Sequence, residues 1–164
     1  MNSKLKLLLL PVSGIIVVLI VLCFAITHFT QKDNATMKMA IFPTGTAHGS
    51  YYFELKDKTL ICSFGIRRNN NIKEKNFLQE TLEVRETELT AQNLQNLLDM
   101  ADELQASGYT THSRDVWDSW DVLLLYNGKV YQTDCWDNES EIFGKIISEV
   151  RRLSPILVDL HGFS

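Results

Sequence analysis

The sequence predicts an α+β protein in which an N-terminal transmembrane helix precedes a small antiparallel sheet covered by two helices. Three observations support this class: an unbroken apolar run near the N-terminus, two stretches with the alternating pattern of β-hairpins, and two capped amphipathic helices. The expected order of elements after the membrane helix is β-ββ-β-α-ββ-α.

The apolar run covers residues 7–26 and contains no charge. As a helix it would span about 30 Å, the thickness of a bilayer's hydrocarbon core. A cleaved signal peptide would have a shorter apolar stretch and small residues at its cleavage site. A lipoprotein anchored at Cys23 would need a small residue in place of Leu22. We therefore expect an uncleaved anchor within residues 1–29 that contacts the lipid bilayer through its apolar run.

The distribution of charge predicts the orientation of the chain in the membrane and excludes some classes of binding partner. Lys4 and Lys6 precede the apolar run, which favours an N-terminus in the cytoplasm and the rest outside the plasma membrane. Residues 30–37 are polar and indicate a linker, and residues 38–164 are expected to form one extracytoplasmic domain. From Thr30 onward there are 14 basic and 20 acidic residues, a net charge of −6. This charge argues against nucleic acid as a partner.

The first half of the predicted domain is β-rich. A short strand is expected at residues 37–42, followed by a hairpin of residues 50–56 and 59–67 with period-2 alternation. If Asp57-Lys58 is a two-residue turn, Leu55 lies opposite Leu60 and Phe53 opposite Cys62, on one apolar face. Asp-Lys is an unfavourable sequence for such a turn, so a longer loop is the alternative. A polar, exposed loop follows at residues 67–76. Residues 80–88 are interpreted as a strand because of Leu82 and Val84, although Leu78 and Leu82 also have the spacing of a helical turn.

A helix is expected at residues 91–106. Thr90 has the residue type of an N-cap, and Leu89 and Leu94 match the positions of a hydrophobic staple. Gly108 supplies the left-handed residue that ends such a helix.

Residues 119–126 and 129–136 flank Asn127-Gly128, a strong signal for a hairpin with a two-residue turn. That turn fixes the register, so Val122 should face Thr133 and Asp121 should face Asp134.

The last helix is expected to begin at Asn138, with Glu141 completing a capping box, and to stop at Pro155. The tail at residues 156–163 is apolar enough to pack on the domain, and we expect it to cover part of the face opposite the helices.

Carboxylates and tryptophans concentrate where the second hairpin begins and ends, which gives a candidate ligand-binding patch for a cation, a sugar or a basic partner. An alternative is that these residues are core, helix-capping or simply solvated. The patch consists of Trp117, Asp118, Asp121, Asp134, Trp136 and Asp137.

The repulsion between the facing carboxylates of Asp121 and Asp134 can be accommodated in three ways. Two opposed carboxylates disfavour each other by roughly 0.2–1 kcal/mol, which water can tolerate. Otherwise a basic neighbour such as Arg114, or a bound cation with Asp118 and Asp137 as further ligands, would relieve the repulsion.

Cysteine and histidine give few sites. Cys62 and Cys135 could form a disulfide if their strands are neighbours, or they are buried thiols. The four histidines are scattered, without the paired spacing of a metal site, and no nucleotide or cofactor motif is present, so we expect no metal and no cofactor.

These features favour a non-catalytic, membrane-tethered domain that binds a protein or a cell-envelope ligand. The alternative is a cell-envelope hydrolase that uses Asp118 and Asp137 as acid and base. A third reading is an accessory subunit that docks through the helix face around Ser13 and Gly14.

Overall fold

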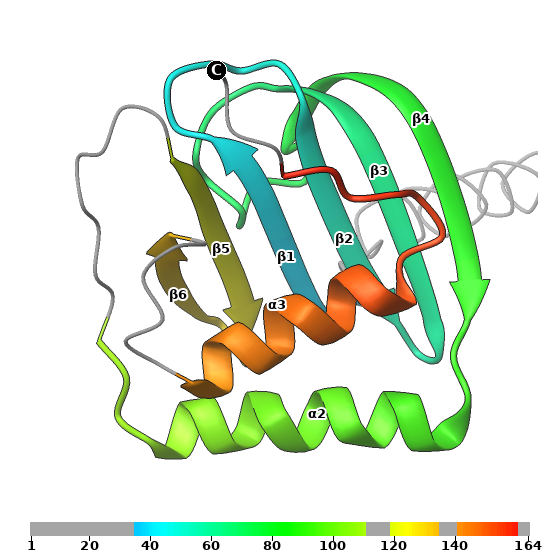
Figure 1. Ribbon diagram of the computed structural model, residues 1–164, viewed down its shortest axis with the longest axis vertical. Helices are drawn as coiled ribbons and strands as arrows, with labels where there is room; N and C mark the ends of the chain where they lie inside the picture. Colours follow the sequence, from blue (N-terminus) through cyan, green and yellow to red (C-terminus); the bar gives the residue numbers. More distant parts are fainter. Residues whose placement is uncertain (1–34, 111–118, 135–140, 161–164) are drawn as a thin grey trace, which may run out of the picture. The chain divides into compact units, whose positions relative to one another are not determined.

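The centre of the structure is a six-stranded antiparallel sheet (Figure 1); this computed structural model describes residues 35–110, 119–134 and 141–160. The strands lie in the order β4-β3-β2-β1-β5-β6, so β1 lies between two hairpins. Their bounds are β1 (Ala35–Pro43), β2 (Ser50–Lys56), β3 (Thr59–Arg67), β4 (Leu78–Glu88), β5 (Trp120–Tyr126) and β6 (Lys129–Asp134).

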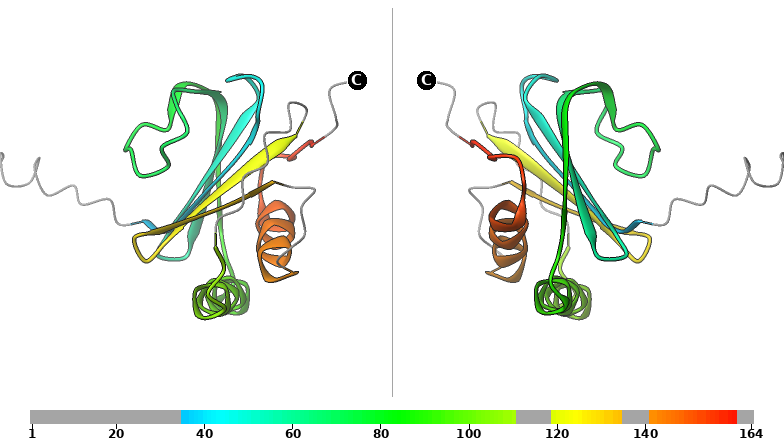
Figure 2. Two further views of the ribbon diagram at one scale, coloured as in Figure 1. Left: turned by 90° about the vertical axis from the view of Figure 1, so that its left-hand side faces the viewer. Right: turned by 90° about the vertical axis from the view of Figure 1, so that its right-hand side faces the viewer.

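Two helices accompany this sheet. Helix α3 (Glu141–Leu153) lies across one face, and α2 (Ala91–Ala106) runs beside it at the ends of the strands (Figures 1 and 2). Both helices bury a stripe of side chains at helical spacing, as an amphipathic helix on a sheet does. The buried residues are Leu97, Ala101 and Leu104 of α2, and Phe143, Ile146, Ile147 and Val150 of α3.

The predicted fold class needs correction. The described chain is mostly β, with a single sheet of six strands and two helices, rather than an α+β domain behind a membrane helix. Two strands of the sheet, β1 and β4, are longer than the sequence pattern predicts. β1 already begins at Ala35, inside the expected linker, and β4 extends over 11 residues despite its charged sequence.

The expected single-pass membrane architecture is also contradicted. Within the part of the chain that the structure describes, no helix is both long and apolar enough to cross a membrane. The apolar run at residues 7–26 meets the length that a bilayer requires, but length and hydropathy alone do not establish a spanning helix. That run lies outside the described residues.

Both predicted hairpin registers are confirmed. Asp121 pairs with Asp134 and Val122 with Thr133 across β5 and β6, and Leu55 pairs with Leu60 across β2 and β3. The backbone of the Asn127-Gly128 turn has positive φ at both residues, 47° and 78°, as a type I′ turn requires. The first hairpin has the two-residue turn rather than the longer loop, with Lys56 paired to Thr59 and φ of 52° at Asp57.

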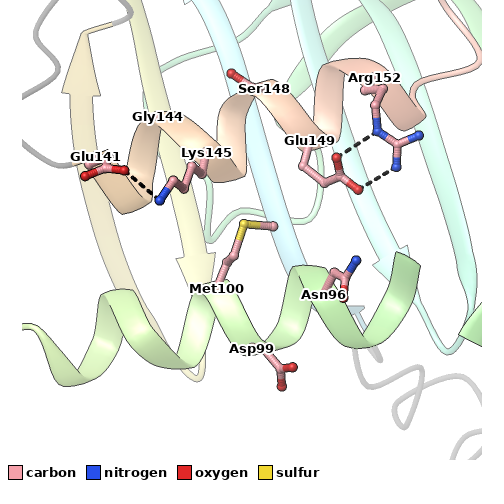
Figure 3. Close-up of a pocket in the computed structure, with 9 residues that line it drawn as sticks. All are labelled: Asn96, Asp99, Met100, Glu141, Gly144, Lys145, Ser148, Glu149 and Arg152. Carbon is pink, nitrogen blue, oxygen red and sulfur yellow. Dashed lines mark hydrogen bonds and ion pairs between the residues drawn. The ribbon is translucent and has the colours of Figure 1, made fainter. Parts of the chain in front are cut away.

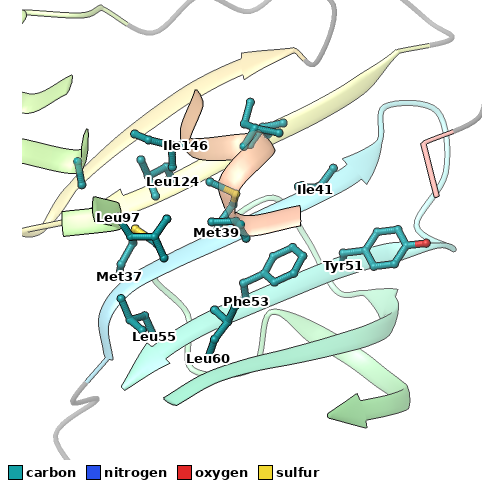
Figure 4. Close-up of a cluster of buried hydrophobic side chains, with 14 of the residues drawn as sticks. Met37, Met39, Ile41, Tyr51, Phe53, Leu55, Leu60, Leu97, Leu124 and Ile146 are labelled. Atoms are coloured by element: carbon teal, nitrogen blue, oxygen red, sulfur yellow. The ribbon is translucent and has the colours of Figure 1, made fainter. Parts of the chain in front are cut away.

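The main core fills the space between the sheet and the helices (Figure 4). Alternate residues of three central strands supply it because side chains of a strand point to opposite faces in turn. Met39, Phe53 and Leu124 come from adjacent strands in register and are at most 1% exposed.

A second, smaller cluster covers the opposite face, and its origin corrects two expectations. The loop at residues 67–76 was expected to be exposed, yet its Ile72 is only 1% exposed. Phe77, which directly follows that loop, is also 1% exposed, and both residues belong to one cluster with Phe42 and Tyr52. The apolar tail was expected on this face, but its Ile156 joins the main core on the helix side. The sequence misled because isolated apolar residues in a polar loop give no periodic signal.

The tail is otherwise ordered as expected. Ile156 and Val158 are buried, and Leu160 packs against the main core. Leu157 differs, because 87% of it is exposed. The backbone amide of Asp159 donates a hydrogen bond to the Tyr51 hydroxyl, which ties the tail to β2.

The predicted cap of α2 is confirmed and gives a first test. Thr90 Oγ1 accepts a hydrogen bond from the backbone amide of Asn93 at 3.2 Å. Thr90→Ala should lower the free energy of unfolding by about 0.5–2 kcal/mol, because that amide loses its partner. Urea unfolding measures this loss. Thr90→Ser keeps the acceptor and should be close to wild type; equal losses in both variants would contradict a capping role. The cap expected at Asn138 lies outside the described residues.

Candidate functional site

The structure brings together two members of the predicted acidic-aromatic patch. Asp121 and Asp134 are cross-strand neighbours at the end of the second hairpin, as predicted. The other four members, Trp117, Asp118, Trp136 and Asp137, lie outside the described residues, as does Arg114. The patch as a ligand site therefore stays a prediction, and so does the use of Asp118 and Asp137 as a catalytic pair.

The surroundings of this aspartate pair differ from the expected solvated surface. Asp121 is 8% exposed and Asp134 is 7% exposed. Asp121 is the register neighbour of Phe42, and the guanidinium of Arg67 lies 4.4 Å from the centre of the Phe42 ring. Burial lowers the pKa of Arg67, while the negative charge of Asp121 raises it. The chain itself thus supplies a cation near Asp121, a role that sequence reasoning had given to Arg114 or a metal.

Among the described residues, no three His, Cys, Asp or Glu side chains converge as a metal site would require. Of the two cysteines considered either as a possible disulfide or as buried thiols, Cys62 is a free, buried thiol. Burial, partly opposed by a hydrogen bond from Ser154, raises its pKa to about 11. Three strands separate β3, which holds Cys62, from β6, which ends one residue before Cys135. The condition of neighbouring strands is not met, and Cys135 itself lies outside the described residues.

A groove of about 790 Å³ lies between α2 and α3 (Figure 3). Both helices turn an outward stripe at i, i+3 and i+4 spacing toward it, because their apolar stripes face the sheet. The lining residues are Asn96, Asp99 and Met100 of α2, and Glu141, Gly144, Lys145, Ser148, Glu149 and Arg152 of α3.

The floor and the wall of this groove differ in chemistry. The Met100 side chain points from α2 toward α3, into the space between Lys145 and Glu149 (Figure 3). A flexible thioether at such a place adapts to the shape of what it contacts. On the α3 wall, Glu141 pairs with Lys145 at 2.7 Å and Glu149 pairs with Arg152 at 2.6 Å.

These ion pairs favour the ionised form of all four side chains. The hydrogen bond from Lys145 lowers the pKa of Glu141, and that from Arg152 lowers the pKa of Glu149. The pKa of each basic partner is raised in return. A general acid or base works best with a pKa near the operating pH. The direction of all four shifts therefore favours recognition by fixed charges over proton transfer.

A second hollow of about 440 Å³ adjoins the groove at the C-terminal end of α3. The two hollows share Ser148 and Arg152, so together they follow α3 from Glu141 to the tail. Here the exposed Leu157 adds an apolar surface beside the guanidinium of Arg151, which donates a hydrogen bond to the Val158 carbonyl.

Sequence reasoning missed this groove. The apolar stripe of α3 predicted which side packs on the sheet, and the charged stripe looked like an ordinary solvated face. The groove exists because α2 lies beside that stripe, and no local pattern encodes the distance between two helices separated by a hairpin.

Comparison of this chain with known proteins finds no matching family, no matching curated relative and no matching solved structure.

Proposed function

We propose that this chain is a non-catalytic binding domain that takes an extended segment of a partner protein along α3. The observation that carries the proposal is the pair of hollows along α3, the groove and the adjoining hollow, which share Ser148 and Arg152. A volume of about 790 Å³ lies within the usual range of ligand sites. Helix α3 has 13 residues and is roughly 20 Å long, which is the length of about six extended residues, and the two hollows lie along it.

The lining describes the partner. Fixed charges of both signs alternate along α3, so polar side chains of either sign find a counterpart, while Leu157 and Met100 offer apolar contacts. A small cation would find no unpaired carboxylate on α3's side of the groove, because Glu141 and Glu149 each pair with a basic residue. A peptide of mixed composition, with an apolar residue placed at Leu157, fits this surface best.

Selection from a phage-displayed library of random short peptides on the full chain tests the proposal. Enriched peptides should share a motif that contains an apolar residue, and Ser148→Trp should weaken their binding by about tenfold or more, because Ser148 lines both hollows. Gln92→Trp adds the same bulk at an exposed position of α2 outside the lining and should bind like wild type. Failure to enrich a motif, or equal binding by both tryptophan variants, would refute the proposal.

A further inference from the structure

The second hollow, at the C-terminal end of α3, differs from the groove in the charges that line it. Its lining contains two cations, Arg151 and Arg152, and no acidic residue. Asp159, the acidic residue of the tail, is not among the lining residues. The groove, in contrast, is lined by acidic and basic residues together. The second hollow can therefore select for one sign of charge, and its volume of about 440 Å³ is within the usual range of ligand sites.

The two arginines of this hollow are not equally available. Nε and Nη2 of Arg152 donate hydrogen bonds to the two carboxylate oxygens of Glu149, at 2.8 and 2.6 Å. Among the described residues, no carboxylate pairs with Arg151, whose guanidinium donates a hydrogen bond of 3.4 Å to the Val158 carbonyl oxygen. A guanidinium has five N–H donors in a planar fork that matches a carboxylate. Because Arg151 is also exposed, its remaining donors can bind an incoming carboxylate.

An apolar side chain on a fixed backbone lines the same hollow. Leu157 is 87% exposed, although its neighbours Ile156 and Val158 are buried. The Ser154 hydroxyl donates a hydrogen bond of 2.6 Å to the Ile156 carbonyl oxygen, and the Asp159 amide bonds the sheet, so the backbone on both sides of the leucine is held. A single exposed leucine is ordinary on a protein surface. This one differs because it shares a hollow with an available guanidinium.

We propose that the second hollow selects the partner segment by an aspartate or glutamate side chain, which the Arg151 guanidinium binds, and by a nearby apolar side chain that packs on Leu157. The inference rests on the proposed function, because it assigns the chemistry of the bound segment at one end of the same site. Residues two positions apart in an extended segment point to the same face. The acidic residue and the apolar residue of the partner should therefore lie within two positions of each other.

The net charge of the chain does not favour an acidic partner. It is −4, so the chain as a whole repels such a segment. Salt screens charges that are farther apart than about 8 Å at physiological ionic strength, whereas the contact with Arg151 is direct. The preference for an acidic segment should therefore depend on this one guanidinium rather than on the charge of the whole chain.

Selection of random peptides, run in parallel on wild type, Arg151→Gln and Arg151→Lys, tests the inference. Peptides enriched by wild type should contain an acidic residue within two positions of an apolar one. Changing that acid to its amide in a synthetic peptide should weaken binding to wild type by about fivefold, the upper range for an exposed ion pair. The same change should hardly affect binding to Arg151→Gln. Arg151→Lys keeps the positive charge and should still prefer the acid.

Arg68→Gln changes the net charge as Arg151→Gln does, at an exposed position outside the lining, and should keep the full preference. Thermal melts check that each variant is folded, which the exposure of Arg151 favours. If the acid and amide peptides bind wild type equally well, or if Arg151→Gln keeps the preference, this inference is overturned while the peptide-binding function stands. If wild type enriches no peptide, both are refuted.

Discussion

Replacing Gly65 by alanine should destabilise the domain by about 1–3 kcal/mol, the cost of inserting a methyl group into a well-packed site. A Cβ atom at this position of β3 would fall on the backbone carbonyl oxygen of Glu80, with the Glu80 carbonyl carbon and Thr81 Cα at 3.1 Å. These are backbone atoms of β4, so relief requires the two strands to separate. The contact arises where β4 has an extra residue and the register shifts between Phe64 and Gly65.

The sign of this effect is diagnostic. The φ angle of Gly65 is not positive. Without a clash, alanine would therefore be neutral or would stabilise by about 0.4–1 kcal/mol, because it restricts the unfolded chain. Urea unfolding of wild type and variant gives the sign. Relative to wild type, the variant should show a larger increase in the hydrogen-exchange rates of β4 amides than of β1 amides. A variant as stable as wild type would mean that β4 does not approach Gly65 so closely.

The parts of this fold that sequence predicts correctly are those with short-range signals. Asn127-Gly128 fixes a turn and, through it, every pairing of β5 with β6, because a two-residue loop allows one register. Thr90 marks the start of α2 for the same reason, since its side chain satisfies an amide three residues away.

The parts that could not be predicted depend on distant segments. Nothing near β1 shows that it pairs with β5, whose sequence lies some 80 residues later, although this pairing joins the two hairpins into one sheet. Ile72 and Phe77 are likewise isolated apolar residues in a polar loop. They are buried because the loop folds over Phe42 and Tyr52 and removes the apolar surface of all four side chains from water.

The candidate site also has features that local sequence predicts and features that depend on distant segments. The pairing of Asp121 with Asp134 followed from a local turn, but its burial beside Arg67 did not, because Arg67 comes from a different hairpin. The groove between α2 and α3 depends on where two helices lie relative to each other. Its charged wall has the sequence of an ordinary exposed helix face, so only the arrangement of the helices distinguishes it.

Stability should fall in alkaline solution, and Tyr126 should account for a large share of the loss. Its side chain is 6% exposed, and its hydroxyl donates a hydrogen bond of 2.7 Å to Asp102 of α2. Burial, then the hydrogen bond to this carboxylate and its negative charge, raise the pKa of Tyr126 to about 12. The ordinary value is 10.0, so above that pH the unfolded chain releases a proton that the folded chain retains.

The contribution of Tyr126 is therefore fully present below pH 10 and is lost as the pH rises through 12. Linkage gives a loss of about 1 kcal/mol at pH 11 and about 2–3 kcal/mol once the folded group also ionises. Urea unfolding at a series of pH values from 7 to 11 measures it. The pKa values of Tyr51 and Tyr131 are also raised by burial, so wild type should show a steeper decline than this share alone.

Two variants isolate the part that belongs to Tyr126. Tyr126→Phe has no ionising group, so its stability should decline less between pH 9 and pH 11, by the about 1 kcal/mol assigned above. Asp102→Asn removes the negative charge but leaves the burial, which is the largest cause of the shift, so its decline should lie between those of wild type and Tyr126→Phe. If wild type and Tyr126→Phe lose stability in parallel, the hydroxyl of Tyr126 titrates as it does in the unfolded chain, and its hydrogen bond to Asp102 is not maintained in solution.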